Sequence, residues 1–263
     1  MSDGVSPRTI ADSGWLAAAA LQSVLKVLGG ENGEARIAGG AVRNALLGEE
    51  IADIDIATVH EPDEVTRRCE AAGFSVHPTG VEHGTVTVVV HEGDVAHTFE
   101  VTTLRVDVET YGRHARVGFT ADWKADAARR DFTINALYCD ADGTIFDPLG
   151  GLADIETRTV RFAGDPHARI REDYLRILRF FRFYARYGVD GPDPESLAAC
   201  RELRDGLRQL SAERMRAELT TCTLIATDPP EGIGPVSGSR LSPPGPGHGT
   251  PPPELRPTVP TPV

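Results

Sequence analysis

Two acidic residues lie two positions apart in the run DIDIA at residues 53–57, where polar and apolar side chains alternate. This alternation predicts a half-buried β-strand, and residues i and i+2 of a strand point to the same face. Asp53 and Asp55 would then place two carboxylates side by side, where they repel each other unless a cation neutralises them. Such oxygen ligands suit Mg²⁺ bound together with substrate phosphates. The alternative is a pair of exposed acids at a strand edge.

A glycine turn precedes this pair in the run GGAVR at residues 39–43. Gly39 and Gly40 predict a turn into a helix, where free backbone N–H groups and the helix dipole attract anions. Arg43 would add a positive charge. Two glycines before a helix are also common in tight turns without a ligand. Because this turn lies shortly before Asp53 and Asp55, the two features together predict a site for a nucleoside triphosphate and its metal ion.

Further polar residues could complete this site. Glu100 lies on a later predicted strand and could join the metal pair, although an exposed strand carboxylate is an equally good interpretation. In the run RRDFTINA at residues 129–136, Arg130 could bind a phosphate, while Asp131 and Asn135 could recognise ribose hydroxyls. A salt bridge within a turn is the alternative for these residues.

A fourth group of charges falls in a predicted helix. Asp173, Arg176 and Arg179 follow one another at three-residue spacing, which places them near one helix face, and Arg182 continues the series. The alternative is a solvated ion pair, which would stabilise the helix by only a few tenths of a kcal/mol.

The elements that position these residues form an α+β pattern followed by helices. After Thr102 the periodicity is lost through residues 111–114, which predicts a mobile loop. From Pro166 onward the pattern is helical. We expect one helix with a buried stripe at Leu175, Leu178, Phe181 and Ala185, a second over about residues 194–207, and a third that begins at Ser211. The other expected elements are helices at residues 13–28 (with Ser13 as N-cap), 41–47 and 62–72, strands at 35–38, 53–57, 74–77, 85–90 and 95–101 with a hairpin turn at 92–94, and a strand and turn at 138–146.

Four regions follow from these elements. We expect an N-terminal packing helix in residues 1–34, an α+β domain in 35–162, an incomplete helical domain in 163–226 and a Pro/Gly-rich tail in 227–263. The tail has too few large apolar residues to fold, so disorder is expected there.

Composition narrows the class of protein. The chain has 263 residues, of which 40% are hydrophobic, enough for at least one sizeable core. A net charge of -12 argues against a protein that coats nucleic acid, so any RNA contact must be local. The arginines cluster accordingly, although a GC-rich gene would also favour them; they are Arg129, Arg130, Arg169, Arg171, Arg176, Arg179, Arg182 and Arg186.

Location and redox chemistry are also constrained. No apolar run approaches the roughly 20 residues of a membrane span, and residues 1–8 lack a secretory signal pattern, so we expect a cytoplasmic protein without membrane contact. Cys69, Cys139, Cys200 and Cys222 are far apart in the sequence, which predicts reduced, buried side chains rather than a metal knuckle or a disulfide framework. The sequence gives no indication of oligomeric state.

Seven segments in order resemble the class II tRNA nucleotidyltransferase (CCA-adding enzyme) and bacterial poly(A) polymerase family, within the DNA polymerase beta superfamily. They are GGAVRNALLG, DIDIAT, HGTVTV, RRDFTINALY, FDPLGG, GDPHARIREDYLRILRFFRF and SAERMRAEL. Each alone could arise by chance, but the ordered set, from about Arg36 to Leu219, is highly specific. The resemblance implies a DNA polymerase beta-like head, a small mixed sheet with helices, followed by an all-α neck.

The resemblance also implies residue roles. Asp53 and Asp55 would bind the catalytic Mg²⁺, and Asp173 with Arg176 would read the base. Cytosine and adenine each present an amino donor beside a ring-nitrogen acceptor, so one carboxylate and one guanidinium can pair with either. Guanine and uracil reverse this pattern and would leave buried polar groups unpaired, at about 1–3 kcal/mol each. The implied nucleotide contacts are Gly40 and Arg43 at the triphosphate, Arg130 and Asp131 at phosphate and ribose, and Arg179 and Arg182 as supporting residues.

The implied activity is the addition of C and A nucleotides to the 3′ end of tRNA. The RNA hydroxyl would attack the α-phosphate of CTP or ATP and release pyrophosphate, with metal ions held by the acids. Poly(A) synthesis uses the same head motifs and is an alternative. A second alternative, of another class, is a fragment that binds nucleotide or RNA without turnover.

Two departures from the family pattern stand out. Asn44 follows Arg43 where the family usually has an aspartate; the amide keeps the hydrogen-bonding shape, so modest weakening is expected. In addition, family members continue past SAERMRAEL into further helical regions that grip tRNA, whereas here the composition changes to proline and glycine. We therefore expect a truncated or frameshifted homologue, a hypothesis that resequencing of the 3′ end of the gene would test.

Overall fold

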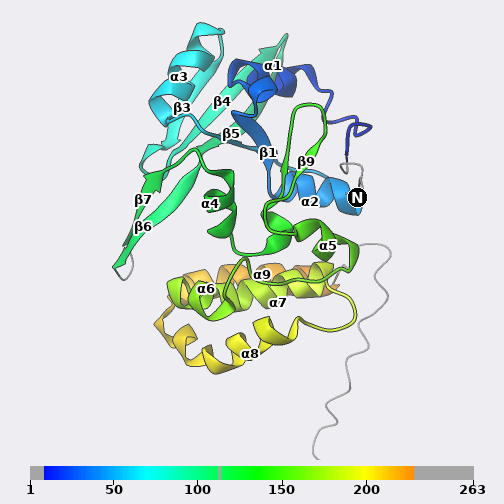
Figure 1. The fold of residues 1–263 in the computed structure, drawn as a ribbon, viewed down its shortest axis with the longest axis vertical. Coiled ribbons are helices and arrows are strands. Elements are labelled where there is room, and N and C mark those ends of the chain that lie inside the picture. The colour runs from blue at the N-terminus through cyan, green and yellow to red at the C-terminus, as the bar shows by residue number, and fades with distance from the viewer. Residues whose placement is uncertain (1–8, 112–113, 228–263) are drawn as a thin grey trace, which may run out of the picture. The chain divides into compact units, whose positions relative to one another are not determined.

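A seven-stranded mixed sheet dominates the N-terminal part of the computed structural model, which describes residues 9–111 and 114–227. Its strand order is β3-β4-β5-β2-β1-β8-β9 (Figure 1). Neighbouring strands are antiparallel except β2 and β5, which are parallel. The predicted α+β class is confirmed. The strands are β1 (Ala35–Ala38), β2 (Asp55–Thr58), β3 (Ser75–Gly80), β4 (Thr85–Glu92), β5 (Val95–Thr103), β8 (Tyr138–Cys139) and β9 (Ile145–Phe146).

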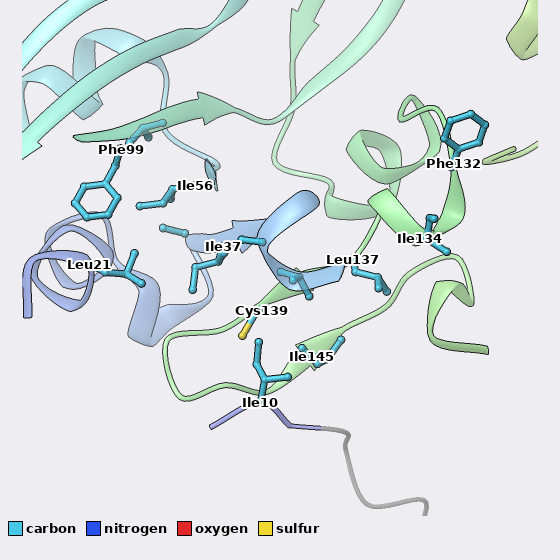
Figure 2. Packing of buried hydrophobic residues seen from close by; sticks show 14 of the residues in the cluster. Ile10, Leu21, Ile37, Ile56, Phe99, Phe132, Ile134, Leu137, Cys139 and Ile145 are labelled. Atoms are coloured by element: carbon cyan, nitrogen blue, oxygen red, sulfur yellow. The ribbon is translucent and has the colours of Figure 1, made fainter. Parts of the chain in front are cut away.

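One face of this sheet is apolar and covered by helices. In β4 every second residue is buried, namely Val86, Val88 and Val90. The helices α1 (Ala19–Val27) and α3 (Pro62–Ala71) pack against this strand, and Figure 2 shows side chains of the sheet and of α1 in one buried cluster. Because strand side chains alternate between faces, Asp55 of β2 and Glu100 of β5 lie on the other face, whereas Thr58 and Thr103 are buried. This second face also carries a smaller buried cluster, which includes Ala38, Ala57 and Tyr138, so the acids lie at the edge of packed structure.

The N-terminal helix is shorter than the sequence predicts. It begins at Ala19, not near Ser13, and residues before it form turns, in which the Leu16 N–H donates to the Ser13 carbonyl. The apolar spacing from Leu16 onward is helical, but Gly14 and the turn at Ser13 interrupt the first part.

The expected mobile loop after Thr102 is wrong for the described residues. Strands β6 (Arg105–Tyr111) and β7 (His114–Phe119) pair antiparallel as a separate two-stranded sheet. The run RVDVET at 105–110 does alternate, as a strand requires, but the polar residues at 111–114 conceal it. Residues 112–113 lie outside the described part of the chain.

Helices form the remainder of the structure (Figure 1). Helix α7 packs against both α6 and α9. The second expected helix ends at Glu202 and continues as a 3-10 helix, and the third begins at Ala212, with the Arg214 N–H donating to the Ser211 hydroxyl. The elements are α2 (Gly40–Leu47), α4 (Trp123–Ala128), η3 (Thr133–Asn135), α5 (Gly151–Glu156), α6 (Pro166–Glu172), α7 (Leu175–Tyr187), α8 (Pro194–Glu202), η4 (Arg204–Gln209) and α9 (Ala212–Thr227).

The buried stripe of α7 differs from the predicted one. Phe181 is 43% exposed and Ala185 is also exposed, so the stripe through these residues is wrong. The buried residues are Ile177, Phe180, Phe183 and Tyr187 instead. Apolar residues occur on two faces of this helix, so spacing alone does not decide between them. Ring contacts decide which face is buried. The ring centroids of Phe183 and Phe132 are 5.0 Å apart, and those of Phe180 and Phe162, which stack, are 5.7 Å apart.

These aromatic contacts join the sheet region to the helices, and the described residues fall within one compact unit. The predicted boundaries at residues 34, 162 and 226 stay predictions. The expectations for residues 228–263, including disorder, and for residues 1–8 lie outside the described part. Within that part, no helix has both the length and the apolar character to cross a membrane. Cys69, Cys139 and Cys200 are buried and not in disulfides.

Candidate functional site

A cavity of about 440 Å³ brings together residues that are far apart in the sequence. It is bordered by the β1–α2 turn, the start of β2, the η3 segment and the α6–α7 region. A second cavity of about 590 Å³ adjoins it, and Asp55 lines both. Asp53 and Glu100 line only the second cavity, and Arg182 lines neither. The predicted residues that line the first cavity are Gly39, Gly40, Arg43, Asp55, Arg130, Asp131, Asn135, Asp173, Arg176 and Arg179; Phe183 joins them.

The acidic group lies where β2 meets β5. Strand β2 begins at Asp55, so Asp53 precedes the strand and does not belong to it, a small correction to the prediction. In the parallel register Asp55 lies opposite Glu100. Burial raises the pKa of Asp55 above its ordinary value, and the charges of Glu100 and Asp53 raise it further, against a lowering by Arg130. This clustering of negative charge favours binding of a cation.

The donor set suits a metal ion only in part. Within residues 9–111 and 114–227, no three His, Cys, Asp or Glu side chains are arranged to hold a metal ion. Asp55 and Glu100 nevertheless offer hard oxygen ligands in adjacent strands. Mg²⁺ commonly takes one or two carboxylates and completes its shell with water and substrate phosphates. The residues present therefore fit a Mg²⁺ ion that arrives with a nucleotide.

Gly39 occupies a position that requires glycine. Its φ of 66° and ψ of −114° are accessible only to a residue without Cβ, and a Cβ there would lie 3.0 Å from an Arg130 guanidinium nitrogen. Its N–H donates to the Leu137 carbonyl at 2.9 Å. The turn thus places the start of α2 directly against Arg130.

Arg43 is held by its neighbours on all sides. It is 8% exposed, and its Nε and Nη2 donate to Asn44 Oδ1 at 3.1 and 2.8 Å, while Nη1 donates to Asn135 Oδ1. Its guanidinium carbon lies 4.5 Å from the Tyr187 ring centroid. Burial lowers the pKa of Arg43, since desolvation disfavours its charge. Asn44 thus supports Arg43 through an amide oxygen, and the triphosphate contact of Arg43 stays a prediction.

The RRDFTIN segment supplies a cation and an anion to the cavity. Arg130 donates to Asp126 Oδ2 at 3.2 Å and to the Asn135 carbonyl at 3.2 Å. Asp131 accepts hydrogen bonds from Arg179 at 2.5 Å and from Asn135 at 3.0 Å. Burial raises the pKa of Asp131, but these partners, Arg179 foremost, outweigh it and hold the pKa below its usual value. Asp131 is therefore neutralised from within the protein.

The predicted base-reading pair lies at the junction of α6 and α7. Asp173 has an extended backbone between these helices, with φ of −153° and ψ of 108°, so the prediction that it shares one helix with Arg176 is wrong. Asp173 accepts the Leu175 N–H at 3.1 Å and the Arg214 guanidinium at 2.7 Å. Arg176 donates to Glu172 at 2.5 Å and to the Arg169 carbonyl at 2.8 Å. Both side chains are therefore oriented by other residues while they line the cavity.

Sequence reasoning missed three supporting residues, Asp126, Arg214 and Glu218. On α9, Glu218 accepts from Arg179 at 3.4 Å and from Arg182 at 2.6 Å. The spacing of Arg214 and Glu218, one helical turn apart, was the available signal for a second charged face next to α7. Asp126 precedes Arg130 by four residues, the same spacing of an acid and an arginine, but nothing in the sequence indicates that Asp126 is buried.

Comparisons with known proteins agree with this geometry. Residues 35–161 match the family model described as the poly A polymerase head domain. The CCA tRNA nucleotidyltransferase 1, mitochondrial, of Homo sapiens is 48% identical over 203 residues, covering 76% of this chain and 46% of the relative. The CCA-adding enzyme of Levilactobacillus brevis is 40% identical over 188 residues, covering 71% of this chain and 45% of the relative.

Solved structures give the same result. The Bacillus stearothermophilus CCA-adding enzyme in complex with CTP has a TM-score of 0.66 and 36% identity, over 77% of this chain and 47% of that one. A tRNA nucleotidyltransferase complexed with a primer tRNA and an incoming ATP analogue has a TM-score of 0.59 and 28% identity, over 76% of this chain and 54% of that one. The chain thus spans about half the length of the curated relatives it matches.

Proposed function

Because the chain belongs to the class II tRNA nucleotidyltransferase and bacterial poly(A) polymerase family, we propose that it adds C and A nucleotides to the 3′ end of tRNA from CTP and ATP. One observation carries the proposal: a single cavity joins the carboxylate of Asp55 to the guanidinium groups of Arg130, Arg176 and Arg179. A cavity of about 440 Å³ with this charge distribution suits a nucleoside triphosphate. Relatives of both names, CCA-adding enzyme and tRNA nucleotidyltransferase, have been solved with CTP or an ATP analogue.

The proposed reaction is a direct phosphoryl transfer. The RNA 3′ hydroxyl loses its proton to solvent as its oxygen attacks the α-phosphate, the P–O bond between the α- and β-phosphates breaks, and pyrophosphate leaves. Arg130 and the α2 turn bind the phosphates and orient them in line with the hydroxyl. Asp53, Asp55 and Glu100 would hold Mg²⁺, which supplies activation of the hydroxyl and charge stabilisation of the leaving group.

Base choice falls to Asp173 and Arg176 in this proposal. One accepts from the amino group of cytosine or adenine, and the other donates to the neighbouring ring nitrogen. Uracil and guanine reverse donor and acceptor, so they would leave a buried group unpaired. Arg214 and Glu172 keep the two side chains in place for this pairing.

The test is incorporation of labelled CTP and ATP into a tRNA that lacks its 3′ CCA, with purified chain and Mg²⁺. We expect both to be incorporated and UTP and GTP to be rejected. Asp53→Ala and Asp55→Ala should each lower the rate by at least about a hundredfold without unfolding the protein, because the metal ligands are lost. The matched control is Asp94→Ala, an exposed acid in the β4–β5 turn, which should act as wild type.

Three outcomes would contradict the proposal in different ways. Incorporation of ATP alone would favour poly(A) synthesis. Nucleotide binding without incorporation at saturating RNA would favour a binding fragment. Wild-type turnover by Asp55→Ala would remove the metal assignment.

We also propose a cytoplasmic location. The human relative is named as mitochondrial, so cell fractionation with antibodies against this chain is the deciding measurement.

A further inference from the structure

Asp126 on α4 is a buried acid that the proposed function leaves without a role. It is 3% exposed, and both of its carboxylate oxygens accept hydrogen bonds. Oδ1 accepts the Arg105 N–H at 3.0 Å, at the start of β6. Oδ2 accepts the Tyr138 hydroxyl at 2.7 Å and Arg130 Nε and Nη2 at 3.3 and 3.2 Å. A buried carboxylate with this many specific partners has a fixed orientation.

This carboxylate fixes Arg130 together with two other groups. The Asn135 carbonyl accepts from Arg130 Nη1 at 3.2 Å, and the guanidinium carbon lies 4.9 Å from the Tyr138 ring centroid. Gly39 closes the remaining side, since a Cβ there would lie 3.0 Å from Nη1. Arg130 nevertheless lines the cavity. Because a guanidinium has five N–H donors, donors remain for a ligand while the others hold the group in place.

We propose that Asp126 is a positioning residue for nucleotide binding: it holds Arg130 in the orientation that contacts the β- and γ-phosphates of the incoming nucleotide. This inference rests on the proposed function of the cavity. Asp126 acts on the ligand only through Arg130, because it does not line the cavity itself.

The contact pattern explains why the residue at 126 must be a carboxylate. Asparagine has one acceptor oxygen and one NH₂ donor. If its oxygen faced Tyr138 and Arg130, its NH₂ would face the Arg105 N–H, donor against donor. If its oxygen faced Arg105, its NH₂ would face the guanidinium. Either arrangement leaves buried donors unpaired, so Arg130 is expected to move from its position.

The test measures how much the outer phosphates add to affinity. Dissociation constants for CTP and CMP are determined by titration calorimetry with the full-length chain and MgCl₂. The dissociation constant of CMP divided by that of CTP reports how much the β- and γ-phosphates add to affinity. Asp126→Asn should lower this ratio by about ten- to a hundredfold, since a hydrogen bond to a charged group contributes about 1.5–3 kcal/mol, while CMP affinity changes little. Arg130→Lys should lower it similarly, and the double variant should lose no more than either single one.

The matched control is Asp140→Asn. Asp140 also accepts from a partly buried arginine, Arg36, at 2.8 Å, and Arg36 packs on Trp123 and Phe146 beside Tyr138. Neither Asp140 nor Arg36 lines the cavity, so this variant should keep the wild-type ratio. If Asp126→Asn does not fold cooperatively, Tyr138→Phe is used in its place. This variant removes one hydrogen bond to the Asp126 carboxylate, so the ratio of dissociation constants should fall by about threefold.

The outcomes separate this inference from the proposed function. A wild-type chain that binds CTP no more tightly than CMP would overturn both. A ratio that falls with Arg130→Lys but not with Asp126→Asn, or additive losses in the double variant, would overturn only the positioning role. Equal losses of CTP and CMP affinity would assign Asp126 a purely structural role and overturn it as well.

Discussion

Two aspartates that border the same cavity differ in how their charge is balanced. Asp131 is paired with Arg179, and this pairing holds its pKa low despite burial. Asp55 has a raised pKa because burial and the neighbouring acids Glu100 and Asp53 all disfavour its charge. The protein therefore neutralises Asp131 itself, whereas the proposed metal ion would neutralise Asp55. The difference separates a supporting acid from one that would hold a metal ion.

We predict that Asp55→Asn stabilises the protein in EDTA at pH 7. An acid whose pKa is higher in the folded than in the unfolded state destabilises the fold once it is ionised. The loss of stability is complete at pH values above the pKa of the folded state. It disappears at pH values below the pKa of the unfolded state, which is near the ordinary value of 3.8. Surrounding atoms partly desolvate Asp55, but its side chain still has surface that water reaches, so the expected gain in Tm is only about 1–2 °C at pH 7. The gain in Tm should become smaller as the pH falls toward 4. Added Mg²⁺ should raise the Tm of the wild-type protein but not that of Asp55→Asn. Thermal unfolding followed by circular dichroism measures each.

The control for this prediction has the opposite sign. Asp142 has a lowered pKa because its carboxylate accepts the Thr144 N–H in an exposed turn. Asp142→Asn should lower the Tm slightly at pH 7 and lose its effect at low pH. A lower Tm for Asp55→Asn as well, in EDTA, would contradict the account of its charge.

At the scale of elements, sequence patterns predicted strands best where alternation coincided with clear turn residues. The bounds of β1 are those expected, and the β4–β5 hairpin turns at the expected glycine. The β6–β7 pair was missed because the sequence loses its alternation at residues 111–114. The stripe of α7 was wrong because both candidate faces are apolar, and only the rings of Phe132 and Phe162, distant in sequence, decide which face is buried. Long-range packing of this kind leaves no local signal.

The same limit applies to the site. Most of its lining residues were predicted because glycine turns, paired acids and arginine series are local patterns. Their supports were not: Asp126 and Glu218 matter through partners that folding brings to them. Arg182, predicted as a nucleotide contact, instead pairs with Glu218 outside the cavity lining. A role in direct binding for Arg182 therefore stays a prediction without geometric support.

Helix α7 offers a paired test of which face is buried. Phe180 is fully buried and its neighbour Phe181 is 43% exposed. Phe180→Ala should lower the free energy of unfolding by about 3–5 kcal/mol, because it removes ring contacts and leaves a cavity. Phe181→Ala should lower it by only about 1 kcal/mol, because it loses the edge contact with the Phe180 ring at 5.3 Å but leaves no buried cavity. Urea unfolding of the two variants measures both values, and similar losses in the two would contradict the assigned face.

For the molecule as a whole, charge is distributed unevenly. The net charge is -12, yet the cavity is lined by four arginines, Arg43, Arg130, Arg176 and Arg179. Acidic partners hold three of these side chains, Arg130, Arg176 and Arg179, and so fix the orientation of their guanidinium groups at the cavity. This arrangement suits a small polyanion in the cavity, while any contact with RNA outside it has to be local, because many phosphates would meet a net negative chain.

The cavity also links the sheet region to the helices, and this makes a prediction about cooperativity. Its lining comes from the β1–α2 turn, β2 and η3 on one side and from α7 on the other. Arg179 of α7 donates a hydrogen bond to Asp131 and so connects the two sides. Mg²⁺–CTP at about a hundred times its dissociation constant should therefore stabilise both parts together, by about 2.7 kcal/mol, or about 5 to 10 °C in Tm. The two tryptophans, Trp15 and Trp123, report on the sheet region by fluorescence, while circular dichroism at the helical minimum also follows α6 to α9. Both signals should show one transition that shifts by the same amount, with CMP giving a smaller shift. Two separate transitions, of which CTP moves only the one seen by fluorescence, would show that the helices do not contribute to the nucleotide site.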